Sequence, residues 1–349
     1  MAGGNFDNAK NTKNDEFYTQ LTDVSKELMH YKNCFKDKTV FCNCDDPTWS
    51  AFWRYFHLNF EALGLKKLIS THYDKSEPTY KMIYEGGDDN NIEIGVVTPL
   101  EGNGDFRNAE CIELLKEADI VVTNPPFSLF REYVNQLIEY NKPFIIIGNT
   151  NALTYKEIFK LFQSDSIRTG YTNFNVGMFF VVPDWFEKYA RIDEDGHKIA
   201  RVSTSCWFTS LPVKRHKDKL PLWKKYTPEE YPTYENYDAI NVDKYTDIPC
   251  DYNGVIGVPI TFLDKYNPDQ FEIVSLGIVG TCDFTNNREM IILDKNGNET
   301  NKRTFNAKGT LYRKHLSTDK KPAAFKDVKT GELYQSIYAR VLIRKKVGA

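Results

Sequence analysis

The sequence contains no hydrophobic run that is long enough to cross a membrane. Its apolar stretches, such as residues 144–147 and 176–182, are far shorter than the roughly 20 residues of a membrane-spanning helix. Residues 1–16 are polar and rich in Asn, Lys and Asp, without the apolar core of a secretory signal. We therefore expect a soluble, cytoplasmic protein that has no membrane partner.

The sequence also lacks a cysteine framework. Its seven cysteines are odd in number and scattered, which argues against a disulfide-rich secreted domain and fits a reducing cytosol. Cys42 and Cys44 form a Cys-x-Cys pair, but no His or Cys partner lies nearby in the sequence. We therefore expect no metal site.

Net charge is small, at −3, but the charges are unevenly distributed along the chain. Residues 213–225 hold six Lys or Arg against one Asp, and residues 302–326 hold eight against Asp319 alone. An acidic whole with two basic segments is compatible with a nucleic-acid-binding face on one side. Either segment alone is explained equally well by a solvated lysine surface.

Hydrophobic periodicity divides the chain into two parts. Up to about residue 183, apolar strands alternate with segments of helical spacing, which predicts an α/β fold with a mainly parallel, doubly wound sheet. Beyond it, Trp, Tyr, Pro and Lys dominate and helical spacing fades, which indicates a less regular α+β region. The expected strands are residues 39–45, 67–74, 119–122, 142–148, 174–182, 200–211 and 254–263, and the expected helices are residues 50–63, 109–117 and 128–140. A capping box at residues 154–157 predicts a further helix. Residues 86–91 are expected to form a hairpin or loop.

The most informative motif follows the strand at residues 119–122. There the chain reads Asn124-Pro125-Pro126-Phe127, and proline can neither continue a sheet ladder nor leave its own backbone angle free. The strand must therefore end in a stiff turn that carries a carboxamide, a proline carbonyl and an aromatic ring. In open α/β sheets, ligands bind at this carboxyl end of the strands.

These three groups suit chemistry on an exocyclic amino group, whose lone pair is delocalised into the ring of its base. The Asn124 side-chain oxygen and the Pro125 carbonyl could accept its two hydrogens, and Phe127 could stack on the ring. A base inside a duplex cannot reach such a pocket unless it is flipped out. The pattern resembles the catalytic tetrapeptide of amino-methyltransferases that use S-adenosylmethionine. By itself, a proline turn that closes a buried strand explains it equally well.

Acidic residues at successive strand ends predict a cofactor pocket. Asp45 and Asp46 follow the first strand, Asp74 ends the second, and Asp105 with Phe106 follows the third. Carboxylates at such positions bind ribose hydroxyls in nucleotide-binding sheets, although a single acid there is more often a helix cap or a turn residue. The first strand lacks the usual Gly-x-Gly turn, and Cys-Asn-Cys-Asp-Asp-Pro stands in its place.

Taken together, these segments resemble the EcoRI-type adenine-specific DNA methyltransferases. The resemblance covers roughly residues 14–275, whereas residues 276–349 match poorly. The matching blocks are residues 15–20, 42–47, 104–107, 119–130, 154–157, 237–242 and 251–263.

The resemblance implies a fold and a set of site residues. The fold is a Rossmann-like class I S-adenosylmethionine-dependent methyltransferase sheet in residues 1–183, followed by an α+β DNA target-recognition region in residues 184–349. Residues 276–349 are then either a β-rich addition to the DNA footprint or a stabilising appendage. The implied catalytic residues are Asn124, Pro125, Pro126 and Phe127; the implied cofactor-binding residues are Phe17, Tyr18, Asn43, Asp45, Asp46, Asp74, Asp105 and Phe106; and the implied DNA-binding residues are Lys214, Arg215, His216 and Lys217.

The function that follows is methyl transfer from S-adenosylmethionine to the amino group of a flipped-out adenine in double-stranded DNA. It would serve restriction-modification or anti-restriction, with a cognate endonuclease as a functional rather than a physical partner. Methylation of adenine in RNA or of a protein glutamine uses the same type of turn, and a tyrosine at position 127 would favour the glutamine enzyme. A non-catalytic DNA-binding protein would have no need of the intact Asn124, Pro125 and Phe127.

Overall fold

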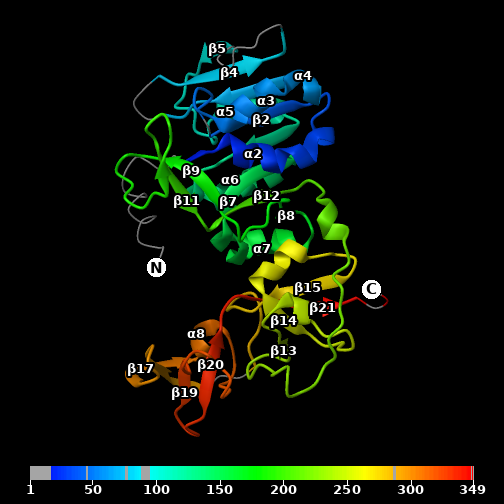
Figure 1. Ribbon diagram of the computed structural model, residues 1–349, viewed down its shortest axis with the longest axis vertical. Helices are drawn as coiled ribbons and strands as arrows, with labels where there is room; N and C mark the ends of the chain where they lie inside the picture. Colours follow the sequence, from blue (N-terminus) through cyan, green and yellow to red (C-terminus); the bar gives the residue numbers. More distant parts are fainter. Residues whose placement is uncertain are drawn as a thin grey trace. The chain divides into compact units, whose positions relative to one another are not determined.

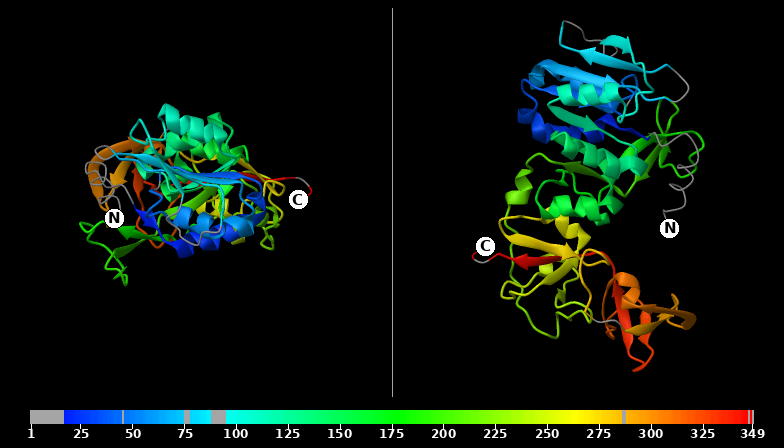
Figure 2. Two further views of the ribbon diagram at one scale, coloured as in Figure 1. Left: turned by 90° about the horizontal axis from the view of Figure 1, so that it is seen from above. Right: turned by 180° about the vertical axis from the view of Figure 1, so that it is seen from behind.

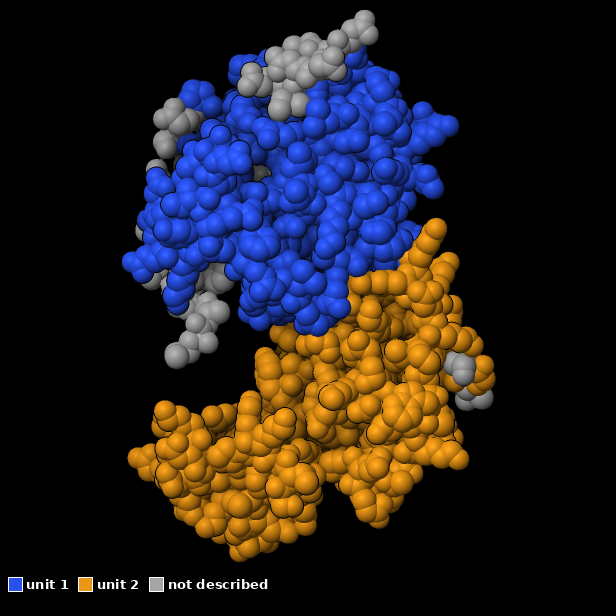
Figure 3. Space-filling view, in the orientation of Figure 1, with its two compact units in different colours: residues 1–153, 166–213 blue, residues 154–165, 214–349 orange. Residues whose placement is uncertain are grey.

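The computed structural model describes residues 17–44, 46–74, 78–87, 95–285, 288–346 and 348. The chain forms two compact units, which Figure 3 shows in different colours. Unit 1 comprises residues 1–153 and 166–213, and unit 2 comprises residues 154–165 and 214–349. Residues 184–213, which follow the change in sequence character at residue 183, therefore pack within unit 1.

Unit 1 is built on an eight-stranded mixed sheet. Its strands, in sheet order, are β5 (Val96–Pro99), β4 (Tyr80–Tyr84), β3 (Lys67–Thr71), β2 (Thr39–Cys42), β6 (Ile120–Thr123), β7 (Phe144–Asn149), β12 (Ser205–Thr209) and β8 (Arg168–Thr169). The inner strands β3, β2, β6 and β7 are parallel, whereas β4, β5, β12 and β8 pair antiparallel. The predicted parallel sheet is thus correct for the four inner strands and wrong for the four outer ones.

Burial explains this division. Every residue of β2 and β6 is buried, as expected for parallel strands that are covered on both faces. Figure 2 shows helices on both faces of the sheet. These helices are α2 (Leu21–Leu28), α3 (Ala51–Leu58), α4 (Phe60–Leu63), α5 (Ala109–Glu117) and α6 (Phe130–Glu139). Strands β4 and β5 pair as neighbours in sequence, which needs no helical crossover.

Local signals set the helix ends. The Ser50 hydroxyl accepts hydrogen bonds from the backbone amides of Phe52 and Trp53, both at 3.1 Å, so α3 starts where the sequence predicts. Gly64, with a φ of 62°, ends α4 in the left-handed conformation. The single helix predicted over residues 50–63 is instead interrupted at Asn59, whose backbone leaves the helical region.

The predicted capping box at Thr154 is wrong. Helix α7 (Lys156–Gln163) has Tyr155 as its N-cap, and this residue makes no side-chain capping bond. Thr154 instead belongs to the preceding short 3₁₀ helix η3 (Thr150–Thr154).

A second, four-stranded sheet in unit 1 holds the beginning of the described chain. Its order is β1 (Tyr18–Thr19), β9 (Met178–Val182), β11 (Lys198–Val202) and β10 (Arg191–Ile192), all antiparallel. The single strand expected over residues 200–211 is therefore two strands, β11 and β12, in different sheets. Pairing of β1 with β9 places residues 17–19 beside a strand that is distant in sequence.

Unit 2 consists mainly of two antiparallel or mixed sheets (Figure 1). Four strands, β13 (Ile240–Asn241), β14 (Ile256–Pro259), β21 (Arg340–Lys345) and β15 (Phe271–Leu276), form one sheet, and helix α7 contacts β15. The other contains β17 (Glu299–Phe305), β16 (Glu289–Leu293), β19 (Phe325–Asp327), β20 (Leu333–Ile337) and β18 (Leu311–Lys314), beside the one-turn helix α8 (Asn306–Gly309). Residues 276–349 are thus β-rich, and their last strand, β21, lies between β14 and β15.

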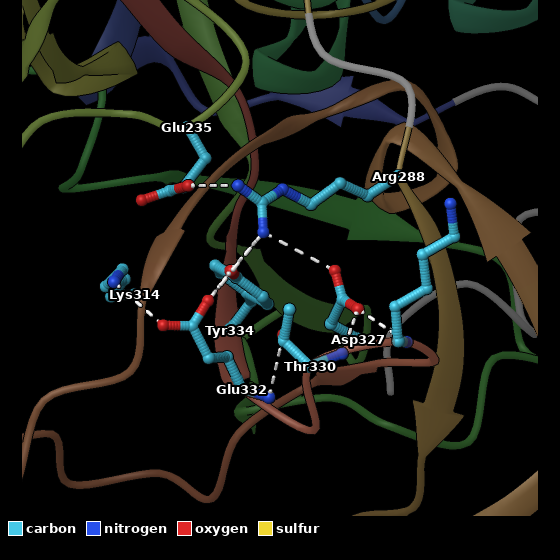
Figure 4. A network of polar contacts seen from close by, with 8 residues as sticks. Glu235, Arg288, Lys314, Asp327, Thr330, Glu332 and Tyr334 are labelled. Carbon is cyan, nitrogen blue, oxygen red and sulfur yellow. Dashed lines mark hydrogen bonds and ion pairs between the residues drawn. The ribbon is translucent and has the colours of Figure 1, made fainter.

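A polar network ties the five-stranded sheet to the segment before β13 (Figure 4). The Arg288 guanidinium lies 3.1 Å from the Glu235 carboxylate and 3.4 Å from that of Asp327, and it donates to the Tyr334 hydroxyl at 2.6 Å. Tyr334 in turn donates to Glu332 at 2.7 Å. Because charge-assisted bonds of this kind are directional, the network fixes how these segments of unit 2 meet.

Candidate active site

The site lies where the order of strands in the large sheet reverses direction. From β2 the chain passes to β3 on one side, whereas β6 pairs with β2 on the other side and leads on to β7. The carboxyl ends of β2 and β6 therefore meet at a topological switch point, which is where open α/β sheets bind ligands.

The Asn-Pro-Pro-Phe segment forms the turn that follows β6, as the sequence predicts. Strand β6 ends at Thr123, and the 3₁₀ helix η2 (Phe127–Leu129) begins after Pro126. Pro125 is buried, whereas Asn124 and Phe127 are half-buried. The Phe127 ring packs against the main apolar core of unit 1, which limits its movement.

Asn124 is held in one orientation and has one unused acceptor. Its Nδ2 donates to the Phe17 carbonyl oxygen at 2.8 Å. Its Oδ1 is buried and has no hydrogen-bond partner in the described structure. Leaving a buried acceptor unpaired costs about 1–3 kcal/mol, so such atoms are rare in native proteins and call for an explanation. The arrangement presents an oriented carboxamide oxygen that can accept one hydrogen bond.

Phe17 is positioned by strand pairing and by packing. The adjacent residues Tyr18 and Thr19 pair with Val181 and Phe180 of β9. The Phe17 ring is buried and meets Phe186 edge-on, with ring centroids 5.6 Å apart. The carbonyl that orients Asn124 is therefore fixed by residues more than 150 positions away in sequence.

The loop after β2 is joined to strand β6, which leads into the Asn-Pro-Pro-Phe turn. Asn43 is buried, and its carbonyl oxygen accepts a hydrogen bond from the Thr123 hydroxyl. Its side-chain Oδ1 accepts one from the Tyr133 hydroxyl of α6. Cys44 then takes a positive φ of 69°, which turns the chain sharply after Asn43. Asp45 lies outside the described residues.

Asp46 forms a group of polar contacts between the end of β2 and the start of α3. Its carboxylate accepts hydrogen bonds from the Thr48 amide at 2.9 Å and from the Tyr80 hydroxyl at 2.9 Å, and His72 Nδ1 lies 3.3 Å away. Burial, together with the bond to Asp46, raises the pKa of Tyr80 to about 12. The Tyr80 hydroxyl therefore stays a donor to this carboxylate at neutral pH.

Asp74 and Asp105 lie on two loops that touch. The Asp74 amide donates to the Asn103 carbonyl at 3.2 Å. Gly104 has a φ of +74°, and a Cβ there would lie 2.0 Å from the His72 carbonyl oxygen, so only glycine allows this approach. The sequence-predicted acids after β3 and before α5 are thus brought to neighbouring loops.

Asp105 is held by a bidentate pair with Arg107, at 2.6 and 2.8 Å. Phe106 is buried, and its ring meets Tyr133 edge-on with centroids 5.0 Å apart. Tyr133 therefore contacts both the loop that carries Phe106 and the loop that carries Asn43.

The four basic residues predicted to bind DNA form the 3₁₀ helix η4 (Lys214–Lys217) of unit 2, and they differ in exposure. Lys214 and Lys217 are exposed. Arg215 forms an ion pair with the carboxylate of Asp264, which is only 2% exposed. His216 is buried, with Nδ1 2.9 Å from the Tyr266 carbonyl oxygen.

Sequence reasoning missed three contributors to the site: Thr123, Tyr133 and the Phe17 carbonyl. Tyr133 and Thr123 lie in an apolar helix stripe and a buried strand, where their types suggest core packing. The backbone carbonyl of Phe17 carries no sequence signal at all.

Among the described residues, one group could in principle hold a metal ion. Asp193, Asp195 and His197 lie in the turn between β10 and β11, with ligand atoms within 4.8 Å of one another. Acidic clusters on an exposed turn are common without an ion, and nothing else at this turn points to a ligand.

Comparison with known proteins decides the family. A family model described as the EcoRI adenine-specific methyltransferase matches residues 5–346. The chain belongs to this family. The resemblance in the sequence motifs is thereby confirmed, and the model extends across residues 276–346, where those motifs gave little match.

Three curated relatives agree with this assignment. The Type II methyltransferase M.EcoRI of Escherichia coli is 48% identical over 303 residues, which make up 79% of this chain and 93% of that protein. M.MpnI of Mycoplasma pneumoniae is 41% identical over an alignment that covers 77% of this chain and 84% of M.MpnI. M.MgeORF184P of Mycoplasma genitalium is 40% identical, covering 77% and 85%. The chain is accordingly an adenine-specific DNA methyltransferase of this family.

No solved structure is significantly similar to the chain. Within the part of the chain that the structure describes, no helix is long and apolar enough to cross a membrane.

Proposed function

We propose that this methyltransferase transfers a methyl group from S-adenosylmethionine to the exocyclic amino group of an adenine that has been flipped out of duplex DNA. The observation that carries the proposal is the buried Asn124 Oδ1, which is oriented by the Phe17 carbonyl and has no hydrogen-bond partner among the described residues. An amino hydrogen of the target base would supply the bond that this oxygen lacks.

The turn would activate the amino nitrogen without a covalent enzyme intermediate. Asn124 Oδ1 would accept one amino hydrogen and the Pro125 carbonyl the other, which draws the nitrogen lone pair away from the ring. The half-buried Phe127 ring would stack on the base and hold it in place. These bonds strengthen as the nitrogen gains positive charge in the transition state, so they lower the barrier as well as bind the base.

The cofactor would supply an electrophilic methyl group on a sulfonium. As the amino nitrogen bonds to the methyl carbon, the carbon–sulfur bond would break, the neutral thioether would leave, and the nitrogen would release one proton to solvent. The loops at the switch point fit such a ligand, because they bring Asp46, Asp74 and Asp105 to the carboxyl ends of strands where ribose and amino groups are bound. Phe17 and Tyr18 would lie beside the methionine end of S-adenosylmethionine, and Phe106 beside the adenine ring of the same cofactor. Asn43 would hold the loop after β2 in place, and Asp45 stays a predicted cofactor-binding residue. Unit 1 would then be a Rossmann-like class I methyltransferase sheet.

We further propose that unit 2 recognises the DNA. It contains every Lys and Arg beyond residue 213, and among these Lys214 and Lys217 are exposed. Flipping a base costs a few kcal/mol, which contacts to phosphates and stacking on Phe127 can offset. The setting would be restriction-modification or anti-restriction in the cytoplasm, where the DNA substrate lies, with a cognate endonuclease as functional partner.

The test is methyl transfer from labelled S-adenosylmethionine to unmethylated genomic DNA, to RNA and to protein in parallel, followed by mapping of the modified bases. We expect N6-methyladenine at one short motif in DNA. Label that enters only RNA or a protein glutamine would support the alternative enzyme readings. DNA binding without any transfer would support the non-catalytic alternative.

A further inference from the structure

An extended segment of unit 2, residues 219–226, presents an exposed tryptophan among lysines. We propose that this segment, the Trp223 segment, is a preformed contact surface for the DNA backbone and for a base or sugar beside it. The inference rests on DNA being the substrate, and it adds a surface beyond the four residues of η4.

The segment is extended and held along its inner edge. The Gln270 side chain clamps Leu220 by accepting from its amide at 2.7 Å and donating to its carbonyl at 2.8 Å. The Lys224 carbonyl accepts from the Cys250 amide at 2.8 Å, and the Tyr226 amide donates to Asp251 at 2.8 Å. Because the backbone is held at Leu220, Lys224 and Tyr226, less conformational entropy remains to be lost on binding.

The alternation decides which side chains face solvent. Residues 219, 221, 223 and 225 are exposed, whereas residues 220, 222, 224 and 226 are half-buried. This two-residue period is that of an extended strand, in which successive side chains point to opposite sides. The outward face therefore carries Lys219, Pro221, Trp223 and Lys225.

The charge of this face suits a polyanion. Lys219 and Lys225 form no ion pair with any described carboxylate, and residues 219–226 contain no acidic residue. Lys219 and Lys225 are six residues apart, about 20 Å in an extended chain. One DNA strand places a phosphate roughly every 3.4 Å along the axis, so several phosphates lie within that length.

Trp223 is the second reason to expect a nucleic acid rather than a bare lysine surface. It is 68% exposed, the highest exposure among the tryptophans of the described chain, and the Lys224 ammonium lies 5.1 Å from its ring centroid. A large ring that is kept exposed on a pinned backbone offers a stacking face, and lysines around it track phosphates. A protein partner would not require this excess of unpaired cations.

The experiment measures binding of the full chain to a short labelled DNA duplex at several salt concentrations. The double variant Lys219→Gln/Lys225→Gln should make the slope of log affinity against log salt less steep by about 1.8, since each lost phosphate contact contributes about 0.9. Trp223→Ala should weaken binding at least about 5-fold, and Trp223→Phe should restore most of it. The KM for S-adenosylmethionine should not change.

Matched controls come from exposed residues elsewhere in unit 2. Lys244→Gln removes an exposed lysine and Tyr338→Ala an exposed aromatic ring, and neither should alter DNA binding. If the wild type methylates DNA but the Trp223 segment variants bind it like the controls, the segment does not contact DNA and this inference is wrong. If the wild type transfers no methyl group to DNA, the proposed function itself fails.

Discussion

At the scale of single residues, the site depends on polar atoms whose partners are fixed. The amide nitrogen of Asn124 donates to the Phe17 carbonyl, whereas its oxygen has no partner in the part of the chain that the structure describes, which selects one of the two carboxamide orientations. A buried amide with a single vacant acceptor is suited to a ligand that brings a donor. Asn43 likewise connects two elements, because its carbonyl accepts a hydrogen bond from Thr123 of β6 and its side chain accepts one from Tyr133 of α6.

Tyr133 provides the first residue-scale prediction. Burial raises the pKa of Tyr133 well above its ordinary value, so its hydroxyl remains the donor to Asn43 Oδ1 throughout the working pH range. Tyr133→Phe leaves that buried oxygen unpaired, which should cost about 1–2 kcal/mol of unfolding free energy and raise the KM for S-adenosylmethionine several-fold. Steady-state kinetics at varied S-adenosylmethionine concentration measures the KM, and thermal unfolding measures the stability.

The control for this change is Tyr140→Phe, at the half-buried end of the same helix. It should leave both quantities at the wild-type value. A Tyr133→Phe variant that loses stability but keeps its KM for S-adenosylmethionine would show that the hydroxyl only stabilises the fold and does not position the Asn43 loop for cofactor binding.

At the scale of elements, the sequence identifies what is local and misses what depends on distant partners. Helix α5, the end of strand β6 at Thr123 and the end of helix α4 at Gly64 were predicted, because period, proline and glycine act within a few residues. The pairing of β12 with β7 and the break of the helix at Asn59 were not predicted. A pattern of buried residues does not indicate which distant segment packs against them. The turn at Asn-Pro-Pro-Phe was predicted, whereas the Phe17 carbonyl that orients Asn124 was not.

The five-stranded sheet of unit 2 gives an element-scale prediction about pH. Buried Arg313 forms a bidentate pair with Asp319, at 2.6 and 2.9 Å, which holds the pKa of that carboxyl below its ordinary value. Because the folded-state pKa is depressed, the stabilisation is complete above the unfolded-state pKa and is lost as pH falls through the folded value. Asp319→Asn should therefore cost about 3 kcal/mol at neutral pH.

The difference between wild type and Asp319→Asn should shrink once the pH falls below about 4, the unfolded-state pKa of aspartate. Denaturant unfolding at a series of pH values measures it, with the exposed Asp269→Asn as control. His315 Nδ1 lies 3.3 Å from the same carboxylate, so His315→Gln separates its share. A gap that stays constant down to strongly acidic pH would contradict the ion-pair account.

At the scale of the whole molecule, the chain order differs from the order in space. Residues 154–165 belong to unit 2 although they interrupt unit 1 in sequence, and the final strand β21 completes a sheet begun at residue 240. The five-stranded sheet is thus inserted between β15 and β21. Residues 276–349 are therefore needed, at least in part, for the sheet that precedes them.

Two truncations test this. A chain that stops at residue 276 loses β21, the strand between β14 and β15, and unit 2 should lose its cooperative unfolding. Deleting residues 278–339 and joining the ends by a short linker keeps β21, because the Gly277 amide already donates to the Arg340 carbonyl at 2.8 Å. This variant should retain a protease-resistant unit 2, and equal proteolysis of both variants would contradict the topology.

The central claim is that Asn124 Oδ1 receives an amino hydrogen of the target adenine, and single-turnover methyl transfer tests it most directly. Asn124→Ala, compared with the exposed Asn296→Ala as control, should slow transfer within the assembled complex by about 100-fold or more, as for loss of one preorganised partner in a transition state. Its affinity for DNA should stay near the wild-type value. Transfer at the wild-type rate in Asn124→Ala would contradict the account.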